Sequence, residues 1–317
     1  MTVPHLLLAL GTVMAWGLNY VAIGWGVRDV PPMLLAALRF ACAAVPLVLV
    51  VPRPRLPFRH LAQYTLTMFV LQFGLLFTGI RLGLPAGLSS LVTQVQVFMT
   101  MGIATGFMGE RPRAGQWAGA AIAFAGIALV GLNMNSRTRL AGFCLALAAA
   151  QAWSLANLVT KRMGPVDPLA LVAWCSLFSV PVLLGASMVL EGPGALRWFW
   201  LHCTWATVGS ILFQAYGATL FGFTAWCFLL RRYPASLVAP MSMLVPVFGM
   251  AGGAAVLGEA LTAWKAAAAT LVLAGLALNQ WAANGKGKGE SFCNVCCKIH
   301  PGPADEAGGN KMTLGQE

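Results

Sequence analysis

The chain has 317 residues, of which 59% are hydrophobic and 9% are charged, and its formal net charge is +11. Soluble domains carry about 25% charged residues, so this composition excludes an ordinary water-soluble protein and indicates a polytopic membrane protein. The basic excess lies mostly in predicted loops, as is usual for membrane proteins, and does not indicate a nucleic-acid partner. The lipid bilayer is the partner that this composition predicts.

Ten apolar runs are long enough to cross the hydrocarbon core of a bilayer, which is about 30 Å thick. They lack the strict alternation of strands, and a helix satisfies its own backbone hydrogen bonds in lipid. The first run has neither a basic start nor a small-residue cleavage site, so it is expected to be a retained helix, not a signal peptide. The predicted spans are 5–27, 33–51, 62–80, 84–108, 115–133, 140–160, 169–190, 204–229, 235–257 and 264–284.

The second half of the chain repeats the first. The Gly-Glu pair at 109–110 returns at 258–259, which is 149 residues later, whereas Trp16 returns as Trp153 after only 137. The second half therefore carries roughly a dozen extra residues, expected near 191–204. Each repeat holds five spans, an odd number, so the repeats must insert in opposite orientations. We expect an all-α membrane protein of two inverted five-helix repeats, residues 1–137 and 138–284, as in many secondary transporters.

The basic residues predict how the chain is oriented in the membrane. If the N-terminus is cytoplasmic, the inner loops hold more Lys and Arg than the outer loops. Both termini are then expected in the cytoplasm. Glu110 would lie at the inner face and its repeat counterpart Glu259 at the outer face.

Five motifs, in this order, resemble the EamA branch of the drug/metabolite transporter superfamily over about residues 5–284. They are Trp16-Gly17-Leu18-Asn19-Tyr20, Leu38-Arg39-Phe40, Leu84-Pro85-Ala86-Gly87-Leu88, Gly109-Glu110-Arg111, and Val245-Pro246-Val247-Phe248-Gly249 followed by Gly258-Glu259. Within that branch the chain is most similar to bacterial exporters of O-acetylserine and cysteine. The resemblance implies a carrier in the bacterial inner membrane that exports small amino-acid-like metabolites. No cofactor is expected.

Polar side chains inside the spans are candidates for a solute site, because they are costly in lipid unless they face a cavity or a partner. Trp16, Asn19 and Tyr20 lie in the first predicted span, and Trp153 and Asn157 lie in the sixth. Matched positions in two repeats predict a shared cavity near the membrane midplane. The alternative is that these residues are interhelical packing and hydrogen-bond contacts.

Three glutamines add further polar candidates: Gln72, Gln94 and Gln96. Gln94 and Gln96 are two residues apart, so on a helix they point about 200° from one another. They cannot both face one cavity. If Gln94 lines the site with Gln72, then Gln96 should make a hydrogen bond between helices.

Arg39 is the only charged residue well inside a predicted span, and no Asp or Glu lies inside a span to neutralise it. It could attract a substrate carboxylate, or it could be a structural residue that snorkels to the interface. The lack of an intramembrane acid argues against cationic solutes and against proton antiport through a midplane carboxylate. Facilitated efflux and coupling through a terminal Glu both stay open.

Small-residue pairs occur at Gly102/Gly106, Gly115/Gly119 and Gly249/Gly253, where helices can approach closely. Packing within the chain is the favoured interpretation, with a sliding seam or a homodimer contact as alternatives. Pro240 and Pro246 predict a kink in the ninth span.

Residues 285–317 are polar and rich in Gly, and are expected to form a disordered cytoplasmic tail. Cys293, Cys296, Cys297 and His300 could bind zinc or carry palmitate, but their spacing favours neither, and no metal site is expected.

The sequence contains no nucleophile–base pair, intramembrane metal motif or phosphate loop, so an enzyme is not expected. The prediction is a secondary transporter that exports small amino-acid-like metabolites by alternating access. The alternatives are export of an aromatic amino acid, purine or drug, and a receptor or scaffold that transports nothing.

Overall fold

The computed structural model describes residues 1–284, so the predicted tail and its cysteines lie outside the described residues. Within this part of the chain every regular element is a helix. Among residues 1–284, ten helical spans are long and apolar enough to cross a membrane, as the sequence predicts.

Each half contributes five spans, some of them built from shorter helices joined end to end. The first half holds α1 (Val3–Asp29), α2 (Pro32–Val50), α3 (Phe58–Tyr64) with η1 (Thr65–Leu71) and α4 (Gln72–Arg81), α5 (Ala86–Val92) with η2 (Thr93–Val95) and α6 (Gln96–Met108), and α7 (Ala114–Leu132). The second half holds α8 (Arg137–Met163), α9 (Pro168–Leu190), α11 (Trp205–Leu212) with η3 (Phe213–Phe221) and α12 (Gly222–Arg232), α13 (Ala235–Val238) with η4 (Ala239–Leu244) and α14 (Val245–Leu257), and α15 (Ala263–Asn284).

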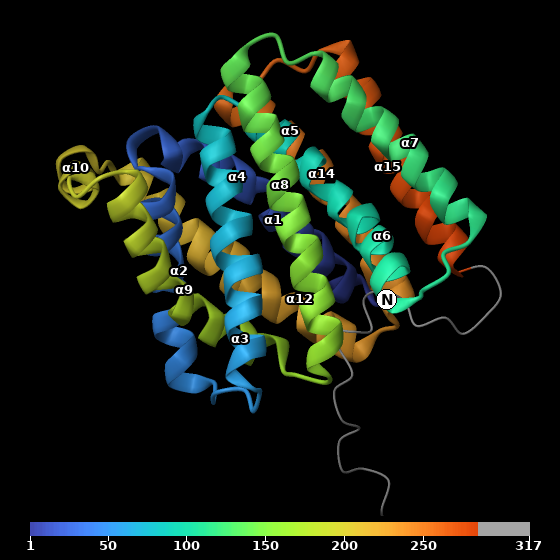
Figure 1. The fold of residues 1–317 in the computed structure, drawn as a ribbon, viewed down its shortest axis with the longest axis horizontal. Coiled ribbons are helices and arrows are strands. Elements are labelled where there is room, and N and C mark those ends of the chain that lie inside the picture. The colour runs from blue at the N-terminus through green and yellow to red at the C-terminus, as the bar shows by residue number, and fades with distance from the viewer. Residues whose placement is uncertain (285–317) are drawn as a thin grey trace, which may run out of the picture.

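Spans of one half pack against spans of the other. α7 lies beside α15 along one edge of the molecule, α2 packs against α9, and α1 packs against α14 in the middle (Figure 1). Because successive spans run in opposite directions, the loops gather at two ends. We call the end that contains Asp29 the Asp29 face, and the other end the Glu110 face. Glu259 lies at the Asp29 face and Glu110 at the opposite one, as the inverted repeat requires.

Glycines allow the closest helix approaches. A Cβ on Gly119 of α7 would lie 2.6 Å from the carbonyl oxygen of Gly275 on α15, and a Cβ on Gly87 would lie 2.9 Å from the Cα atom of Met250. Gly102 has nothing within 4 Å. Pairs that include Gly119 or Gly249 therefore serve packing within the chain, whereas a homodimer contact at Gly102 stays a prediction.

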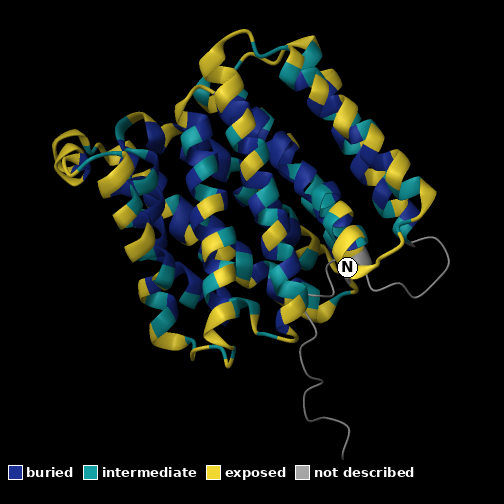
Figure 2. Ribbon diagram, viewed as in Figure 1, coloured by how far each residue is buried: buried dark blue, intermediate teal, exposed yellow. Residues whose placement is uncertain are grey.

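Burial follows the position of each helix in the bundle. Figure 2 shows buried residues concentrated on the central helices and exposed residues on the outward sides and loops. Large apolar side chains such as Leu132 and Leu49 are exposed at 86% and 81%. Such a surface suits the hydrocarbon of a lipid bilayer.

A short helix, α10 (Ala195–His202), lies between α9 and α11, where the extra residues of the second half were expected. It projects at the edge opposite to α7 and α15 (Figure 1). Trp198 Nε1 donates a hydrogen bond of 3.2 Å to the carbonyl oxygen of Asp29, while Trp200 and Leu201 are exposed. Exposed aromatic and apolar side chains at a helix end are typical of the membrane interface.

Candidate functional site

Four spans are broken along their length, and the breaks match between the two halves. The π-helical segment η1 of the third span corresponds to η3 of the eighth, and the 3-10 segment η2 of the fourth corresponds to η4 of the ninth. Pro240 and Pro246 accompany η4, where a kink was predicted. Paired breaks in two repeats mark the solute site of many carriers, and π-segments are frequent at functional sites.

A set of buried polar side chains lies beside these breaks. We call it the central polar group, and its members are Asn19, Arg39, Gln72, Gln214 and Thr219. α1 and α2, which supply the first two members, each pack against α4 and η3, which supply the others. Asn19, Gln72 and Gln214 lie nine or ten residues from the Asp29-face end of their spans. This separation is about 14–15 Å along a helix. That distance corresponds to the middle of a bilayer about 30 Å thick.

Arg39 is buried within this group and makes one hydrogen bond to the protein. Its Nη2 donates to Thr219 Oγ1 at 2.9 Å, and its guanidinium lies 4.4 Å from the ring centroid of Phe73 and 4.7 Å from that of Phe40. Nε and Nη1 have no partner. The side chain does not reach an interface, as a snorkelling residue would. A buried cation with free donors is suited to an anionic group of a ligand.

Three amide side chains of the same group have an unpartnered oxygen: Asn19 Oδ1, Gln72 Oε1 and Gln214 Oε1. Gln214 is held in place because its Nε2 donates to Ser210 Oγ at 3.0 Å. Buried polar atoms are rarely left without a partner, so these oxygens are suited to donors on a ligand. Free donors on Arg39 and free acceptors on the amides together complement a carboxylate and an ammonium or hydroxyl group.

Trp16 contacts the break in the eighth span. Its Nε1 donates to the carbonyl oxygen of Ala218 at 3.0 Å, and its ring lies against Phe223 and Trp226 with centroids 5.8 Å and 5.0 Å away. The indole thus satisfies a backbone acceptor within η3 and forms an apolar wall next to the central polar group.

Tyr20 and Gln94 lie at the break in the fourth span. The Tyr20 hydroxyl is 2.7 Å from Thr93 Oγ1, and Gln94 Nε2 donates to the carbonyl oxygen of Ser242 at 3.5 Å. The second contact joins η2 to η4, the matching break of the other half. Both predicted residues therefore hold the broken segments in position.

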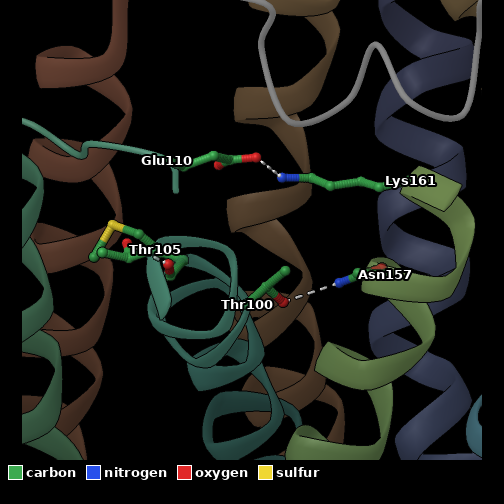
Figure 3. A network of polar contacts seen from close by, with 6 residues as sticks. Thr100, Thr105, Glu110, Asn157 and Lys161 are labelled. Atoms are coloured by element: carbon green, nitrogen blue, oxygen red, sulfur yellow. Dashed lines mark hydrogen bonds and ion pairs between the residues drawn. The ribbon is translucent and has the colours of Figure 1, made fainter. Parts of the chain in front are cut away.

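Within residues 1–284 no hydrogen bond joins Asn157 to Asn19. Asn157 Nδ2 donates to Thr100 Oγ1 at 3.2 Å (Figure 3) and also to Gln96 Oε1 at 2.9 Å, so it joins α8 to α6. Gln96 therefore makes a side-chain hydrogen bond between helices, and Gln94 makes one to the backbone of η4. The Gln96 oxygen lies within reach of the Asn157 amide, so Asn157 makes an interhelical contact here, and its place in the solute site stays a prediction. Trp153 is partly buried against the core, without a hydrogen bond in the described part of the chain.

Gln214 and Thr219 are functional candidates that the sequence reasoning missed. Both lie in the predicted span 204–229, and the cost of a polar side chain in lipid, which singled out Gln72, applies equally to Gln214. Thr219 carried no such signal. Its hydroxyl donates to the carbonyl oxygen of Gln214 at 2.9 Å, a contact that depends on the π-helical turn.

Two inverted bundles around a buried polar group with free donors and acceptors define a membrane transport protein. The chain belongs to the EamA-like transporter family, which matches residues 3–132 and 140–280, once in each half.

Relatives of this chain occur in bacteria. A Salmonella typhimurium protein described as a probable amino-acid metabolite efflux pump is 40% identical over 86% of this chain and 93% of its own length. An Escherichia coli K12 protein with the same description is 38% identical over the same shares. A solved structure with 20% identity aligns with a TM-score of 0.58, covering 88% of this chain and 96% of that one, and shows the same fold.

Proposed function

We propose that this chain exports small amino-acid-like metabolites from the cytoplasm by alternating access, with the solute held at the central polar group. The observation that carries the proposal is Arg39, a buried cation with no acidic partner among residues 1–284 and with two unpartnered nitrogens. A hydrogen bond to a charged group is worth about 1.5–3 kcal/mol, and a buried donor without a partner costs about 1–3 kcal/mol. A solute carboxylate would replace that cost with a favourable contact.

The remaining members of the group favour a second polar end on the solute. The free oxygens of Asn19, Gln72 and Gln214 accept hydrogen bonds, so they suit an ammonium or a hydroxyl group. The rings of Phe40 and Phe73 stack on the guanidinium and leave little polar surface around it. A small zwitterion matches this arrangement better than a large cationic drug, because the central polar group contains no acid that could bind a cation.

The direction and location of transport rest on two further points. Two relatives that are 40% and 38% identical are described as probable efflux pumps of amino-acid metabolites. The distribution of Lys and Arg supports a bacterial inner-membrane protein with both termini in the cytoplasm, so that the Asp29 face is extracytoplasmic. The two repeats, residues 1–137 and 138–284, are the bodies that would move.

The alternative functions differ in the solute that each would need. Export of an aromatic amino acid would keep the need for Arg39, whereas a neutral drug or a purine would not. A receptor or scaffold would need neither the inverted repeat nor unpartnered groups in the membrane. Coupling to protons through an acid in the middle of a span has no support, because Asp29, Glu110, Asp167, Glu191 and Glu259 all lie at helix ends or in loops.

The proposal can be tested in bacterial cells that overproduce the full chain and are loaded with labelled serine or cysteine. We expect label to appear in the medium faster than from cells with an empty vector or with Arg39→Gln at an equal membrane level. Equal release from all three strains, for both solutes and for O-acetylserine, would overturn the proposal.

A further inference from the structure

Glu110 and Glu259 occupy equivalent places in the two repeats. Each follows a glycine in the left-handed conformation, Gly109 with φ 67° and Gly258 with φ 69°. The Glu110 amide donates to the carbonyl oxygen six residues earlier at 3.3 Å, and the Glu259 amide does so at 3.1 Å. The backbones are therefore alike, and a difference between the side chains reflects a difference between the two faces of the molecule.

Glu259 reaches from the second half to the first half. Its carboxylate oxygens accept hydrogen bonds from the backbone amides of Ala86 at 2.6 Å and Gly87 at 3.0 Å, the first amides of the fourth span. These amides carry the positive end of the helix dipole, so an anionic side chain is favoured there. A Cβ on Gly87 would lie 2.9 Å from Glu259 Oε2, so only glycine leaves room for this contact.

Glu110 has a different partner. By repeat symmetry it should accept from the first amides of the ninth span, at Ala235 and Ser236. Instead, its carboxylate accepts from Lys161 Nζ at 2.6 Å, and its side chain is 47% exposed (Figure 3). We call the contact of a glutamate in one half with the first two amides of a broken span in the other half a latch. The latch is thus engaged at the Asp29 face and disengaged at the Glu110 face.

Burial shows the same asymmetry. All seven residues of α5, at the start of the fourth span, are buried, and α5 packs against α14. In the ninth span no residue of η4, which corresponds to residues 90–95 of the fourth span, is buried, although Val238 of α13 is. The contact equivalent to that of α5 with α14 would join α13 or η4 to α6, and among the described helices these elements do not pack closely against one another. The crossing of the fourth and ninth spans is therefore closed at the Asp29 face alone.

We infer that Glu259 and Glu110 are alternately engaged gate latches of the transporter, and that this structure is the state closed at the Asp29 face. In the opposite state, Glu110 accepts from the amides of Ala235 and Ser236, and Glu259 leaves those of Ala86 and Gly87. The inference rests on the proposed transport function, since a latch needs a transport cycle to serve. It assigns to two glutamates outside the spans a positioning role in that cycle.

A cavity of about 450 Å³ lies at the Asp29 face next to the closed latch. Glu259 and Ala86 form part of its wall, together with Arg28, Arg81 and Leu257. Arg81 is anchored because its Nη1 donates to the carbonyl oxygens of Val27 and Arg28. Release of Glu259 would extend this cavity toward the central polar group, and the two arginines would attract a departing carboxylate.

The test uses the full-length chain in membranes, with a single cysteine added and its modification by an impermeant maleimide measured by peptide mass spectrometry. Ser90→Cys reports on the closed crossing, because Ser90 is buried and a Cβ on Gly249 would contact it. Ala239→Cys is its counterpart in the other repeat. We expect slow labelling of Ser90→Cys from the Asp29 face and faster labelling of Ala239→Cys from the Glu110 face.

Glu259→Gln removes the charge from the latch, and we expect it to raise the labelling rate of Ser90→Cys about tenfold and to lower that of Ala239→Cys. Gly87→Ala crowds both the carboxylate and the backbone of α14 at Met250, so it should act in the same direction, and it serves if Glu259→Gln inserts poorly. Glu110→Gln should leave labelling as in the parent and reduce transport.

Glu191→Gln is the matched control. Glu191 also accepts from two backbone amides at the Asp29 face, those of Met33 at 2.6 Å and Leu34 at 3.2 Å, but it joins α9 to α2, not the fourth span to the ninth. We expect no change at Ser90→Cys. Unchanged labelling in both Glu259→Gln and Gly87→Ala, or an equal rise in Glu191→Gln, would overturn the inference. Labelling needs no solute, so the two proposals can fail separately. If labelling contradicts the inference while the wild type still exports solute, the latch alone is wrong. If labelling changes as expected but the wild type exports no solute, the proposed function is wrong.

Discussion

At the scale of single residues, Arg39 has the most demanding position. It is 3% exposed, and Thr219 supplies its hydrogen bond to the protein. The guanidinium is weakly hydrated and stacks well on aromatic rings, so Phe40 and Phe73 make its burial tolerable without an acid. The same contacts hold its remaining donors in a fixed orientation.

Replacement of Arg39 separates a ligand-binding role from a structural one. Lys keeps the charge and loses the planar fork, so Arg39→Lys should raise the apparent KM for carboxylate solutes by about tenfold or more. Arg39→Gln should suppress transport of an amino acid more than that of its methyl ester. The measurement is initial efflux at matched protein levels, and equal loss for acid and ester would show a structural role.

Asn19 and Asn157 form a matched pair for a second prediction. Asn19 Oδ1 has no partner, so Asn19→Leu should abolish efflux with little change in protein yield. Asn157 bonds to Gln96 and Thr100, so Asn157→Leu should cost about 0.6–2 kcal/mol of helix association and retain solute preference. Yield and KM measured side by side check this, and normal transport by Asn19→Leu would remove it from the site.

At the scale of elements, the apolar runs predicted every span to within a few residues, because length and composition decide which segments cross lipid. The breaks within the spans were harder to predict from the sequence. Two prolines indicated the irregular ninth span, but nothing in residues 65–71 or 213–221 announces a π-helix. Those segments depend on tertiary contacts, such as the bond from Trp16 to the Ala218 carbonyl oxygen. The position of the solute group beside them could therefore not be derived from sequence.

The same limit applies to the hydrogen-bond partners of Asn157. Sequence spacing places Trp and Asn at similar positions of the first and sixth spans, but it does not say which neighbour each side chain meets. Asn157 lies six residues from the end of α8, whereas Asn19 lies ten residues from the end of α1. Only the helix arrangement shows that Gln96 is the nearer partner.

Glycine positions give a prediction at this scale. Gly119 lies where α7 and α15 touch, so Gly119→Val should overpack the pair and destabilise the protein by roughly 1–3 kcal/mol. Gly102→Val is the control, since nothing lies within 4 Å of that site. Thermal unfolding in detergent should show a lower midpoint for Gly119→Val alone. A fall of equal size in both variants would instead point to a general effect of valine in these helices.

At the scale of the whole molecule, the inverted repeat places equivalent residues at opposite faces. A substituted-cysteine tag after Gly109 should be cytoplasmic and one after Gly258 extracytoplasmic, because five spans per repeat reverse the insertion. Impermeant labelling of intact and opened cells measures this. Finding both tags on the same side would remove the inverted arrangement and much of the argument for transport.

The central claim is that the buried polar group carries a carboxylate-bearing solute across the membrane. Its most direct test is efflux of labelled amino acids from proteoliposomes that contain the purified full-length chain, with and without a pH gradient. The account predicts saturable efflux in the wild type, competition by small zwitterions such as O-acetylserine, and loss of both in Arg39→Gln. Efflux no faster than from protein-free liposomes across the amino-acid series, under either gradient, would contradict it.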